Sequence, residues 1–517
     1  MNDGRSIDPI ELQVLAGGLR AICDEMGAVL IRAAHSPNIK ERRDCSTALF
    51  DADAELVMQA EHIPVHLGSM PAAVEAVASL ALHRGGAKPD ELWILNDPFE
   101  GGTHLPDITL ISPIFAGGGM IGWAASRAHH ADIGGPTPGG MPAGSRTLAD
   151  EGVVIEPRRI DEAGLAQLAK LMRRPDQRLA DLRAQRAANL LGARRLAELA
   201  ERDGPDRLRR GMEAVLDYAE RRSRAAIGRL ADGVYEASDE LEAPDGSAVP
   251  LRVSVRIEGD RMEFDFAGTS PQVDGNLNCP LPVTHAAVLF AVRALTDPDA
   301  PASAGAFRPV RITAPLGSLL NARPGAAVVA GNVETSSRVA DLVFAALAEV
   351  ADGPAQGQGT MNNLTLSGRS GEGEDLTYYE TMGGGQGACP NAPGPSAVHV
   401  AMSNTLNTPV ESLEGDLPVR VREVAVRRGS GGEGEMHGGD GIVRSIEALA
   451  PLRFSLITER RSTSPAGRKG GGDGARGRNT LNGVPLPAKC EGDLAPGDVL
   501  TIETPGGGGF GPPAEGG

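Results

Sequence analysis

A helix-forming stretch in the middle of the chain constrains its architecture more than any other feature. From about 160 to 230 the sequence is rich in Ala, Leu, Arg and Glu, which are strong helix formers and recur here at helical spacing. Pro175 and the pair Gly204-Pro205 divide this stretch into two or three helices. Its many arginines could form a surface for anions or a partner, but acidic residues alternate with them, which favours a solvated helical face.

The sequence on either side has a different character. Apolar residues at spacings of three to four predict one helix from 8 to about 35, starting at Asp8-Pro9, and a second from 70 to 83. Alternating polar and apolar residues around Glu258-Gly259-Asp260 predict a hairpin. Further strands are expected at about 91–96, 108–115 and 119–127, and further helices at 284–296 and 333–351.

With 517 residues the chain is too long for one core, so we expect an α+β fold with two or three domains. The changes in character delimit four regions: mixed α/β at 1–158, helical at 159–231, mixed α/β at 232–415, and β-rich and Gly-rich at 416–517. Glycine contributes 68 residues, and their clustering marks loops rather than a fibrous repeat. The glycine blocks near 431–441 and 470–478 lack the strand and helix of a phosphate-binding loop, and no Gly-x-x-x-x-Gly-Lys-Ser/Thr motif occurs.

Composition excludes several classes of function. The net charge of −18 disfavours nucleic acid as a partner, and an aromatic content of 3% leaves few rings on which bases could stack. The five cysteines, an odd number at wide spacings, argue against a disulfide framework. The polar N-terminus does not look like a signal peptide, and we see no apolar run of membrane-spanning length. A cytoplasmic protein without a membrane partner is therefore expected.

The residues most suggestive of chemistry lie between 96 and 135. His104 and Asp107 stand three apart in GGTHLPD, and His129, His130 and Asp132 follow in AHHADIGG. Imidazoles and carboxylates on short Gly-flanked segments are typical ligands of divalent Zn, Mn or Fe. Taken alone, a His-x-x-Asp pair is a weak signal, because most such pairs are capping or surface hydrogen bonds. Two such clusters, each flanked by glycines, strengthen the interpretation.

These segments resemble the hydantoinase B / acetone carboxylase alpha-subunit family. The resemblance is carried by NDPFEGGTHLPD at 96–107, AHHADIGG at 128–135 and ERRDCSTALFD at 41–51, with further matches along nearly the whole chain. Those further matches are GNVETS at 331–336, SNTLNTPVE at 403–411 and TPGGGGFG at 504–511.

The resemblance implies the metal-bearing subunit of an ATP-dependent cyclic amide hydrolase. Such an enzyme opens a hydantoin, N-methylhydantoin, 5-oxoproline or lactam ring. A hydantoinase A-type partner subunit binds ATP and phosphorylates the substrate, and metal-bound hydroxide on this chain then acts as nucleophile. We expect a heterotetramer with two copies of each subunit. Two alternatives stay open: a subunit of an ATP-dependent ketone carboxylase, and a non-catalytic scaffold subunit.

The resemblance also suggests individual roles. One divalent metal (Zn, Mn or Fe) would be held by Asp44, His104, Asp107 and either His129 or His130. Adjacent residues on a strand face opposite ways, so one histidine binds; we favour His129. His130 would then act in acid–base chemistry or be buried for packing.

Other polar residues have weaker signals. Asp132 and Glu151 are candidates for orienting water or ligands, although capping would also explain them. Residues His62 and His66 are expected to line the cleft or to be buried for structure. Asn332 and Glu334 are predicted to bind substrate, and Asn276, Asn278 and Gln386 could do so, although turn formation explains most of these. Cys45 and Cys389 lack a nearby base, so no cysteine nucleophile is proposed.

Overall fold

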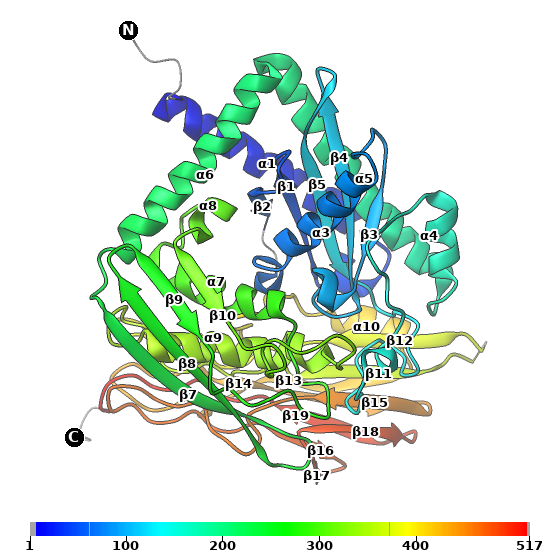
Figure 1. Cartoon of the computed structure of the whole chain (residues 1–517). Helices are drawn as coiled ribbons and strands as arrows, with labels where there is room; N and C mark the ends of the chain where they lie inside the picture. Colours follow the sequence, from blue (N-terminus) through cyan, green and yellow to red (C-terminus); the bar gives the residue numbers. More distant parts are fainter. Residues whose placement is uncertain (1–6, 61–62, 372, 514–517) are drawn as a thin grey trace.

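The computed structural model describes residues 7–60, 63–371 and 373–513, and it confirms an α+β, multi-domain architecture (Figure 1). Four sheets, one in the N-terminal region, one in the middle and two in the C-terminal region, organise this part of the chain. Helices cover the first two sheets, whereas the last two pack on each other. The site described below lies where these regions meet.

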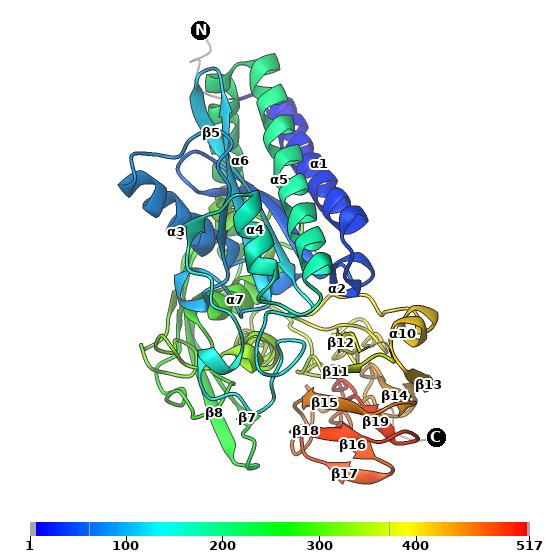
Figure 2. The same ribbon diagram turned by 90° about the vertical axis from the view of Figure 1, so that its right-hand side faces the viewer.

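The N-terminal sheet is antiparallel, with strand order β2-β1-β5-β4-β3-β6. Its strands are β1 (Cys45–Phe50), β2 (Leu56–Ala60), β3 (Trp93–Leu95), β4 (Asp107–Ala116), β5 (Gly119–His129) and β6 (Arg158–Arg159). Both faces are covered, so the central strands are buried along nearly their whole length rather than at alternate residues. Three long helices cover one face and one helix the other, as Figure 2 shows.

The covering helices follow the sequence signals closely. Helix α1 (Pro9–Ala33) begins where the Asp8 side chain accepts a hydrogen bond from the amide of Ile10. The Ala/Leu/Arg/Glu stretch forms α4 (Glu162–Ala169), α5 (Pro175–Asp203) and α6 (Pro205–Ile227), divided at the two predicted positions. Helix α5 packs against α1 and on β4 and β5. The helical segment therefore completes the N-terminal layer, while the four-region division stays a prediction.

One apolar segment of the N-terminal region needs comment. Pro64–His83, which contains α3 (Met70–His83), is long and apolar enough to cross a membrane by length and composition, with a hydropathy of 1.4. We expected no run of this length. However, 56% of it is buried inside the protein, and α3 packs on the second face of the sheet. A core helix explains its composition.

The middle region pairs a sheet with two long helices. Strands β7 (Gly233–Glu242), β8 (Ala248–Glu258), β9 (Arg261–Asp265) and β10 (Val310–Thr313) lie in the order β10-β9-β8-β7. Strands β8 and β9 form the predicted hairpin. Helices α7 (Leu281–Thr296) and α9 (Ser336–Ala346) cover the sheet, and the short α8 (Ala304–Phe307) packs against α6. A π-helical turn, Gly331–Thr335, precedes α9 and is buried throughout.

The C-terminal region is a pair of packed sheets. One contains β11 (Asn363–Arg369), β12 (Asp375–Glu380), β15 (Leu452–Ile457) and β18 (Lys489–Leu494); the other contains β13 (Val419–Arg427), β14 (Gly441–Ala448), β16 (Arg478–Leu481), β17 (Val484–Leu486) and β19 (Val499–Glu503). Two short helices, α2 (Pro37–Lys40) and α10 (Val410–Asp416), lie near this region's border with the first. The Gly-rich blocks pack backbone on backbone: a Cβ at Gly506 would meet the carbonyl oxygen of Ser430 at 1.9 Å.

Candidate metal centre

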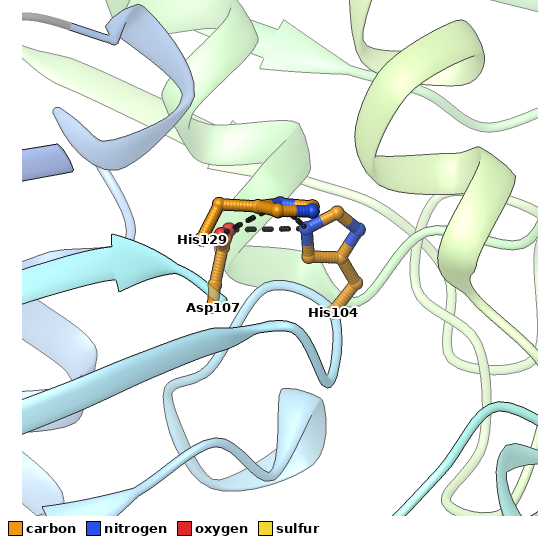
Figure 3. Close-up of side chains that lie close together, drawn as sticks. All are labelled: His104, Asp107 and His129. Atoms are coloured by element: carbon orange, nitrogen blue, oxygen red, sulfur yellow. Dashed lines mark hydrogen bonds and ion pairs between the residues drawn. The ribbon is translucent and has the colours of Figure 1, made fainter. Parts of the chain in front are cut away.

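Two neighbouring strands bring the predicted ligands together. Strand β4 begins at Asp107 and β5 ends at His129, and the antiparallel register places these two residues directly opposite each other. Cross-strand partners on one face lie within reach of a shared ligand. His104 precedes β4 on the Gly-flanked loop, and its ring turns back toward the other two side chains, as Figure 3 shows.

The spacing of the facing atoms fits a metal ion. His104 Nε2 lies 3.2 Å from His129 Nδ1 and 3.4 Å from Asp107 Oδ2, and His129 Nδ1 lies 3.4 Å from Asp107 Oδ1. Ligand atoms held ~2.0–2.1 Å from one ion stand about 3.3–3.4 Å apart in a tetrahedron and about 3.0 Å apart in an octahedron. The two imidazole nitrogens and the two oxygens of the Asp107 carboxylate thus have the separations expected of ligands around one ion.

Unsatisfied buried atoms support the same conclusion. The three side chains are fully buried. Among the atoms that face the centre, Asp107 Oδ1 has no hydrogen-bond partner in the described part of the chain, and the nitrogens His104 Nε2 and His129 Nδ1 contact each other. Buried polar atoms in native proteins almost always have partners, so the free carboxylate oxygen calls for a ligand. Oxygen and imidazole donors suit Zn, Mn or Fe, and the residues present therefore fit the expected divalent ion.

A small cavity of about 20 Å³ adjoins the cluster. This is room for an ion or one to two waters and not for a ring substrate. Its walls also contain Asp44 and His66, together with apolar side chains and several hydroxyls: Ile63, Val65, Val333, Met361, Met402, Tyr379, Thr381, Ser403 and Thr405.

Asp44 and His66 approach the cluster from the other side of β5. Asp44 directly precedes β1, and its backbone carbonyl accepts from the amide of His129 at 3.0 Å. His66 Nε2 lies 3.4 Å from Asp107 Oδ2, while its Nδ1 contacts Ser46 Oγ at 2.9 Å. The structure thus brings His66, predicted only to line the cleft or be buried, to a metal-facing position. Its neighbour His62 lies outside the described residues.

The charges in the cluster interact strongly. Burial acts to raise the pKa of Asp107, but the three surrounding histidines hold it well below its usual range. Burial lowers the pKa of His129 to about 4, whereas in His104 the attraction of Asp107 outweighs burial and raises the pKa. Burial and repulsion from Asp107 raise the pKa of Asp44 to about 7. A cation at this point would relieve the repulsion between the two carboxylates.

Side chains behind the ligands hold them in place. Thr103 Oγ1 donates to Asp107 Oδ2 at 2.5 Å. The ring of Tyr379 stacks on His129, with centroids 4.6 Å apart and planes at 13°. The Tyr379 hydroxyl in turn donates to Asn363 Oδ1 at 2.8 Å. Sequence reasoning missed Tyr379, because nothing local in the sequence marks a residue that reaches the site from β12.

His130 and Asp132 lie away from the cavity. His130 Nε2 contacts Gln185 Oε1 of α5 at 2.9 Å, on the opposite face of the strand from His129. Asp132 accepts hydrogen bonds from the amides of Gly134 and Gly139 and forms an ion pair of 3.0 Å with Arg173. This geometry gives no support to the expectation that either residue acts beside the metal, because both side chains are occupied in holding loops.

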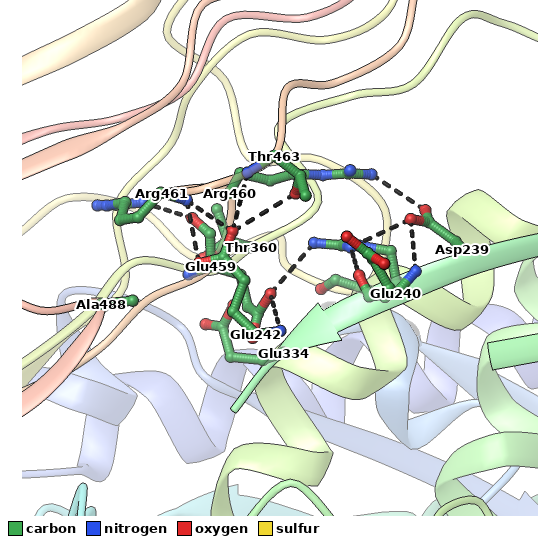
Figure 4. Close-up of polar contacts among 12 residues, drawn as sticks. Asp239, Glu240, Glu242, Glu334, Thr360, Glu459, Arg460, Arg461, Thr463 and Ala488 are labelled. Carbon is green, nitrogen blue, oxygen red and sulfur yellow. Dashed lines mark hydrogen bonds and ion pairs between the residues drawn. The ribbon is translucent and has the colours of Figure 1, made fainter. Parts of the chain in front are cut away.

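The predicted substrate residues Asn332 and Glu334 separate on the π-helical turn. Asn332 lines the cavity, with Nδ2 3.2 Å from His104 Nε2. Glu334 turns away and accepts from the amide of Met361 and from Asn363 Nδ2, at 3.1 and 2.7 Å. Burial, aided by Glu459, raises the pKa of Glu334 to about 7. Figure 4 shows it beside a network of buried ion pairs rather than in the cavity.

The remaining candidates stabilise loops. Glu151 accepts from the amides of Val328 and Val329, and burial raises its pKa to about 7. Asn276 and Asn278 donate to backbone carbonyls of neighbouring loops. Gln386 lies in the Gly-rich packing and Cys45 is buried in β1, while Cys389 is partly exposed; none of these lines the cavity.

The chain matches one family model over nearly its whole length: Hydantoinase B/oxoprolinase, across residues 8–513. It is 40% identical over 543 residues to the 5-oxoprolinase of Saccharomyces cerevisiae. The aligned region covers 98% of this chain but 42% of the yeast protein. The chain therefore spans about two fifths of the length of that relative, and several other curated relatives that it matches are covered to a similar extent.

Solved structures share the fold. An ATP-dependent caprolactamase from Pseudomonas jessenii superimposes with a TM-score of 0.91 at 27% identity, covering 98% of this chain and 91% of that one. A nucleotide-free acetone carboxylase structure gives a TM-score of 0.88 at 19% identity, and the match covers 99% of this chain and 76% of the acetone carboxylase chain. The second likeness shows the fold alone.

Proposed function

Since the chain belongs to the hydantoinase B/oxoprolinase family, we propose that it is the metal-bearing subunit of an ATP-dependent enzyme that opens a cyclic amide. The observation that carries this proposal is the buried cluster of four donor atoms, His104 Nε2, His129 Nδ1 and the two carboxylate oxygens of Asp107, with nitrogen–nitrogen and nitrogen–oxygen separations of 3.2–3.4 Å beside a cavity. A divalent ion held there would lower the pKa of a bound water and polarise a carbonyl oxygen.

The chain's own residues have distinct tasks in this proposal. His104, Asp107 and His129 hold the ion, and Asp44 completes the set from the start of β1. Asn332, with its amide against His104, orients the substrate. The walls of Val65, Val333 and Met361 exclude bulk water, which strengthens each polar contact inside.

Activation of the amide is assigned to a partner subunit. An unstrained amide is a poor electrophile, so an ATP-binding subunit of hydantoinase A type would phosphorylate its oxygen. Water then attacks the activated carbon, the ring C–N bond breaks as its nitrogen takes up a proton, and an acyl phosphate remains. A second water hydrolyses the acyl phosphate and releases phosphate and the ring-opened acid. The sequence has no Walker-type loop, and the caprolactamase chain that it matches is of similar length and belongs to an ATP-dependent enzyme. We propose a cytoplasmic heterotetramer on these grounds.

Elemental analysis tests the metal centre. The purified chain should hold about one divalent ion, and His104→Ala should lose it, because removing one protein ligand opens the shell. His83→Ala provides the matched control, since His83 is exposed at the end of α3. Full metal occupancy in both His104→Ala and Asp107→Ala would show that the ion binds elsewhere.

Assays of the complex separate the reaction classes. With its partner, the chain should convert a cyclic amide to the ring-opened acid in an ATP-dependent reaction. Alone it should neither hydrolyse ATP nor open the ring. A ketone carboxylase is the second candidate, favoured only by the shared fold of acetone carboxylase. Product formation that requires bicarbonate and a ketone would select it. A complex that is fully active with the metal ligands removed would select the scaffold alternative.

A further inference from the structure

A buried arginine stands directly behind the hydroxyl-bearing wall of the cavity. Arg42 NH2 donates to Thr381 Oγ1 at 2.5 Å and to Thr405 Oγ1 at 2.9 Å, and both threonines line the cavity. Its NH1 donates to the carbonyl oxygen of Tyr379 at 2.9 Å, and the guanidinium packs over that ring. Because Tyr379 also stacks on His129, Arg42 lies close behind the metal ligands.

Arg42 forms no direct ion pair, although Asp44 attracts it from farther away. Its side chain is 1% exposed, and no carboxylate lies within 4.0 Å of it among the described residues. Its Nε also has no hydrogen-bond acceptor. An arginine stays charged at every physiological pH, and a buried charge without a counter-ion is costly. The position therefore suits a negative group that is not part of the chain.

The hydroxyl groups and the histidine in front of Arg42 carry one more hydrogen-bonding proton than the hydrogen bonds among them require. Thr381 and Thr405 share a hydrogen bond of 2.8 Å, Thr405 contacts His399 Nε2 at 3.3 Å, and His399 Nδ1 contacts Ser403 at 2.6 Å. These three contacts use three protons, whereas three hydroxyls and a neutral imidazole supply four. The donor direction along this chain of hydrogen bonds depends on which nitrogen of His399 carries the proton. In one direction the unused O–H belongs to Thr381, and in the other it belongs to Ser403. Both line the cavity, which thus gains a donor.

The charge balance points in the same direction. Asp44 and Asp107 are the carboxylates in the cavity wall, and Arg42 and Arg127 are the buried arginines next to them. Arg127 donates to Thr109, Ser69 and the carbonyl of Gly101, and like Arg42 it has no carboxylate within 4.0 Å in the described part of the chain. Among the residues that the structure describes here, these two carboxylates balance these two arginines. A divalent cation would leave the buried site with two positive charges.

From these observations we propose that the cavity binds a phosphate oxyanion together with the divalent ion, with Arg42 and the Thr381 and Ser403 hydroxyls on the side away from the metal. A phosphate dianion offers only acceptors to these donors and cancels the excess charge. It needs more than the roughly 20 Å³ seen here, and the flexible side chains of Met361 and Met402 in the wall can give way. The inference rests on the proposed metal centre and deepens it: the oxyanion is either free orthophosphate or the phosphoryl group of an activated amide.

Coupling between the two ligands tests the idea. Mn²⁺ binding to the purified chain is measured by calorimetry in orthophosphate and in chloride of equal ionic strength. Orthophosphate should tighten Mn²⁺ binding on the order of tenfold, within the usual range for coupled sites. In Arg42→Met the tightening should fall below about twofold, while exposed Arg158→Met should keep it. A phosphate monoester in place of orthophosphate distinguishes the sources, since tightening by both probes favours a substrate-borne phosphoryl group and tightening by orthophosphate alone favours the free ion.

Each outcome is decisive. If Arg42→Met does not fold, the double variant Thr381→Val with Ser403→Ala answers the question, because it removes the spare donor and keeps the charge. Mn²⁺ binding that is identical in phosphate and chloride overturns this inference and leaves the metal centre intact. The same holds if the coupling survives in every folded variant of Arg42, Thr381 and Ser403. Failure of the wild-type chain to bind any divalent ion overturns the metal centre itself.

Discussion

Two clusters of buried polar side chains lie close together in this protein, and they are built in opposite ways. In the buried ion network of Figure 4, acidic and basic side chains satisfy one another: Lys489 Nζ lies 2.5 Å from Glu459 Oε1, and Arg338 lies 3.3 Å from Glu459 Oε2. The network consists of Asp239, Glu242, Arg338, Glu459, Arg460, Arg461 and Lys489. In the metal centre, two imidazole nitrogens face each other beside a cavity, and the carboxylate oxygen Asp107 Oδ1 has no hydrogen-bond partner among the described residues.

The difference separates a structural role from a chemical one. The network joins the end of β7 and helix α9 to residues that follow β15 and begin β18, so it ties the middle region to the C-terminal sheets. The metal centre collects nitrogen and oxygen atoms that repel or leave each other unsatisfied until a cation arrives. Burial alone does not mark a functional site; unbalanced burial beside a cavity does.

The largest effect on stability is expected in the network. Glu459→Ala leaves Lys489 buried without its carboxylate and removes one of the two carboxylates that pair with Arg338, so the free energy of unfolding should fall by about 3–5 kcal/mol. Urea denaturation measures this. The control is Glu236→Ala, which removes an ion pair to Arg252 that is more than half exposed and should cost less than about 1 kcal/mol. Equal losses would mean that the network does not hold the regions together.

In the metal centre the effect should appear in turnover instead. Asp107→Asn keeps the ligand's size but not its charge, so ring-opened product should fall on the order of a hundredfold or more. Substrate-dependent ATP consumption by the complex should fall less, because the partner performs that step. Phosphate and product are measured in one reaction, with Asp53→Asn on an exposed turn as control. Equal proportional losses of both would contradict the proposed division of labour.

Glu334, beside the ion network, should contribute to the pH dependence of stability, as should Asp44 and Glu151. The pKa of Glu334 is about 7 in the folded protein against an ordinary value of 4.5, so its contribution is fully present below pH 4.5 and is lost as the pH rises through 7. The loss by pH 8 is on the order of 3 kcal/mol. Glu334→Gln should flatten the decline between pH 5 and 8, as followed by urea denaturation at each pH. An unchanged slope would place the titrating group elsewhere.

The smallest effect concerns the stacking of Tyr379 on His129. Tyr379→Leu should weaken divalent-ion binding about tenfold, because it removes the ring that fixes the imidazole, whereas Tyr379→Phe keeps the stack and should stay within about twofold. Titration with a metal-competing chelator measures both. If Tyr379→Phe weakens divalent-ion binding as much as Tyr379→Leu does, the hydrogen bond from the Tyr379 hydroxyl to Asn363 contributes more to ion binding than the ring stacking does.

Local patterns in the sequence determined much of this protein. Helices α1, α3 and α7 and the hairpin of β8 and β9 follow from apolar periodicity and turn residues, because these signals act within a few residues of each other. His104, Asp107 and His129 were also within reach, since short Gly-flanked segments at adjacent strand ends can meet without long-range folding. The preference for His129 over His130 as the metal ligand follows from the alternation of side chains along a strand. In the structure these two side chains do lie on opposite faces.

Only the tertiary structure decided which distant residues share the site. Asn332 arrives from the π-helical turn, Tyr379 from β12 and Ser403 from a loop, each more than 200 residues from His104 along the chain. It also decided that Glu334 lies beside the ion network while Asn332, two residues away, lines the cavity, because the π-helical turn points these side chains in different directions. Periodicity fixes which face of an element is buried. What lies against that face, and whether a buried charge finds its partner, depends on packing between regions that no local pattern encodes.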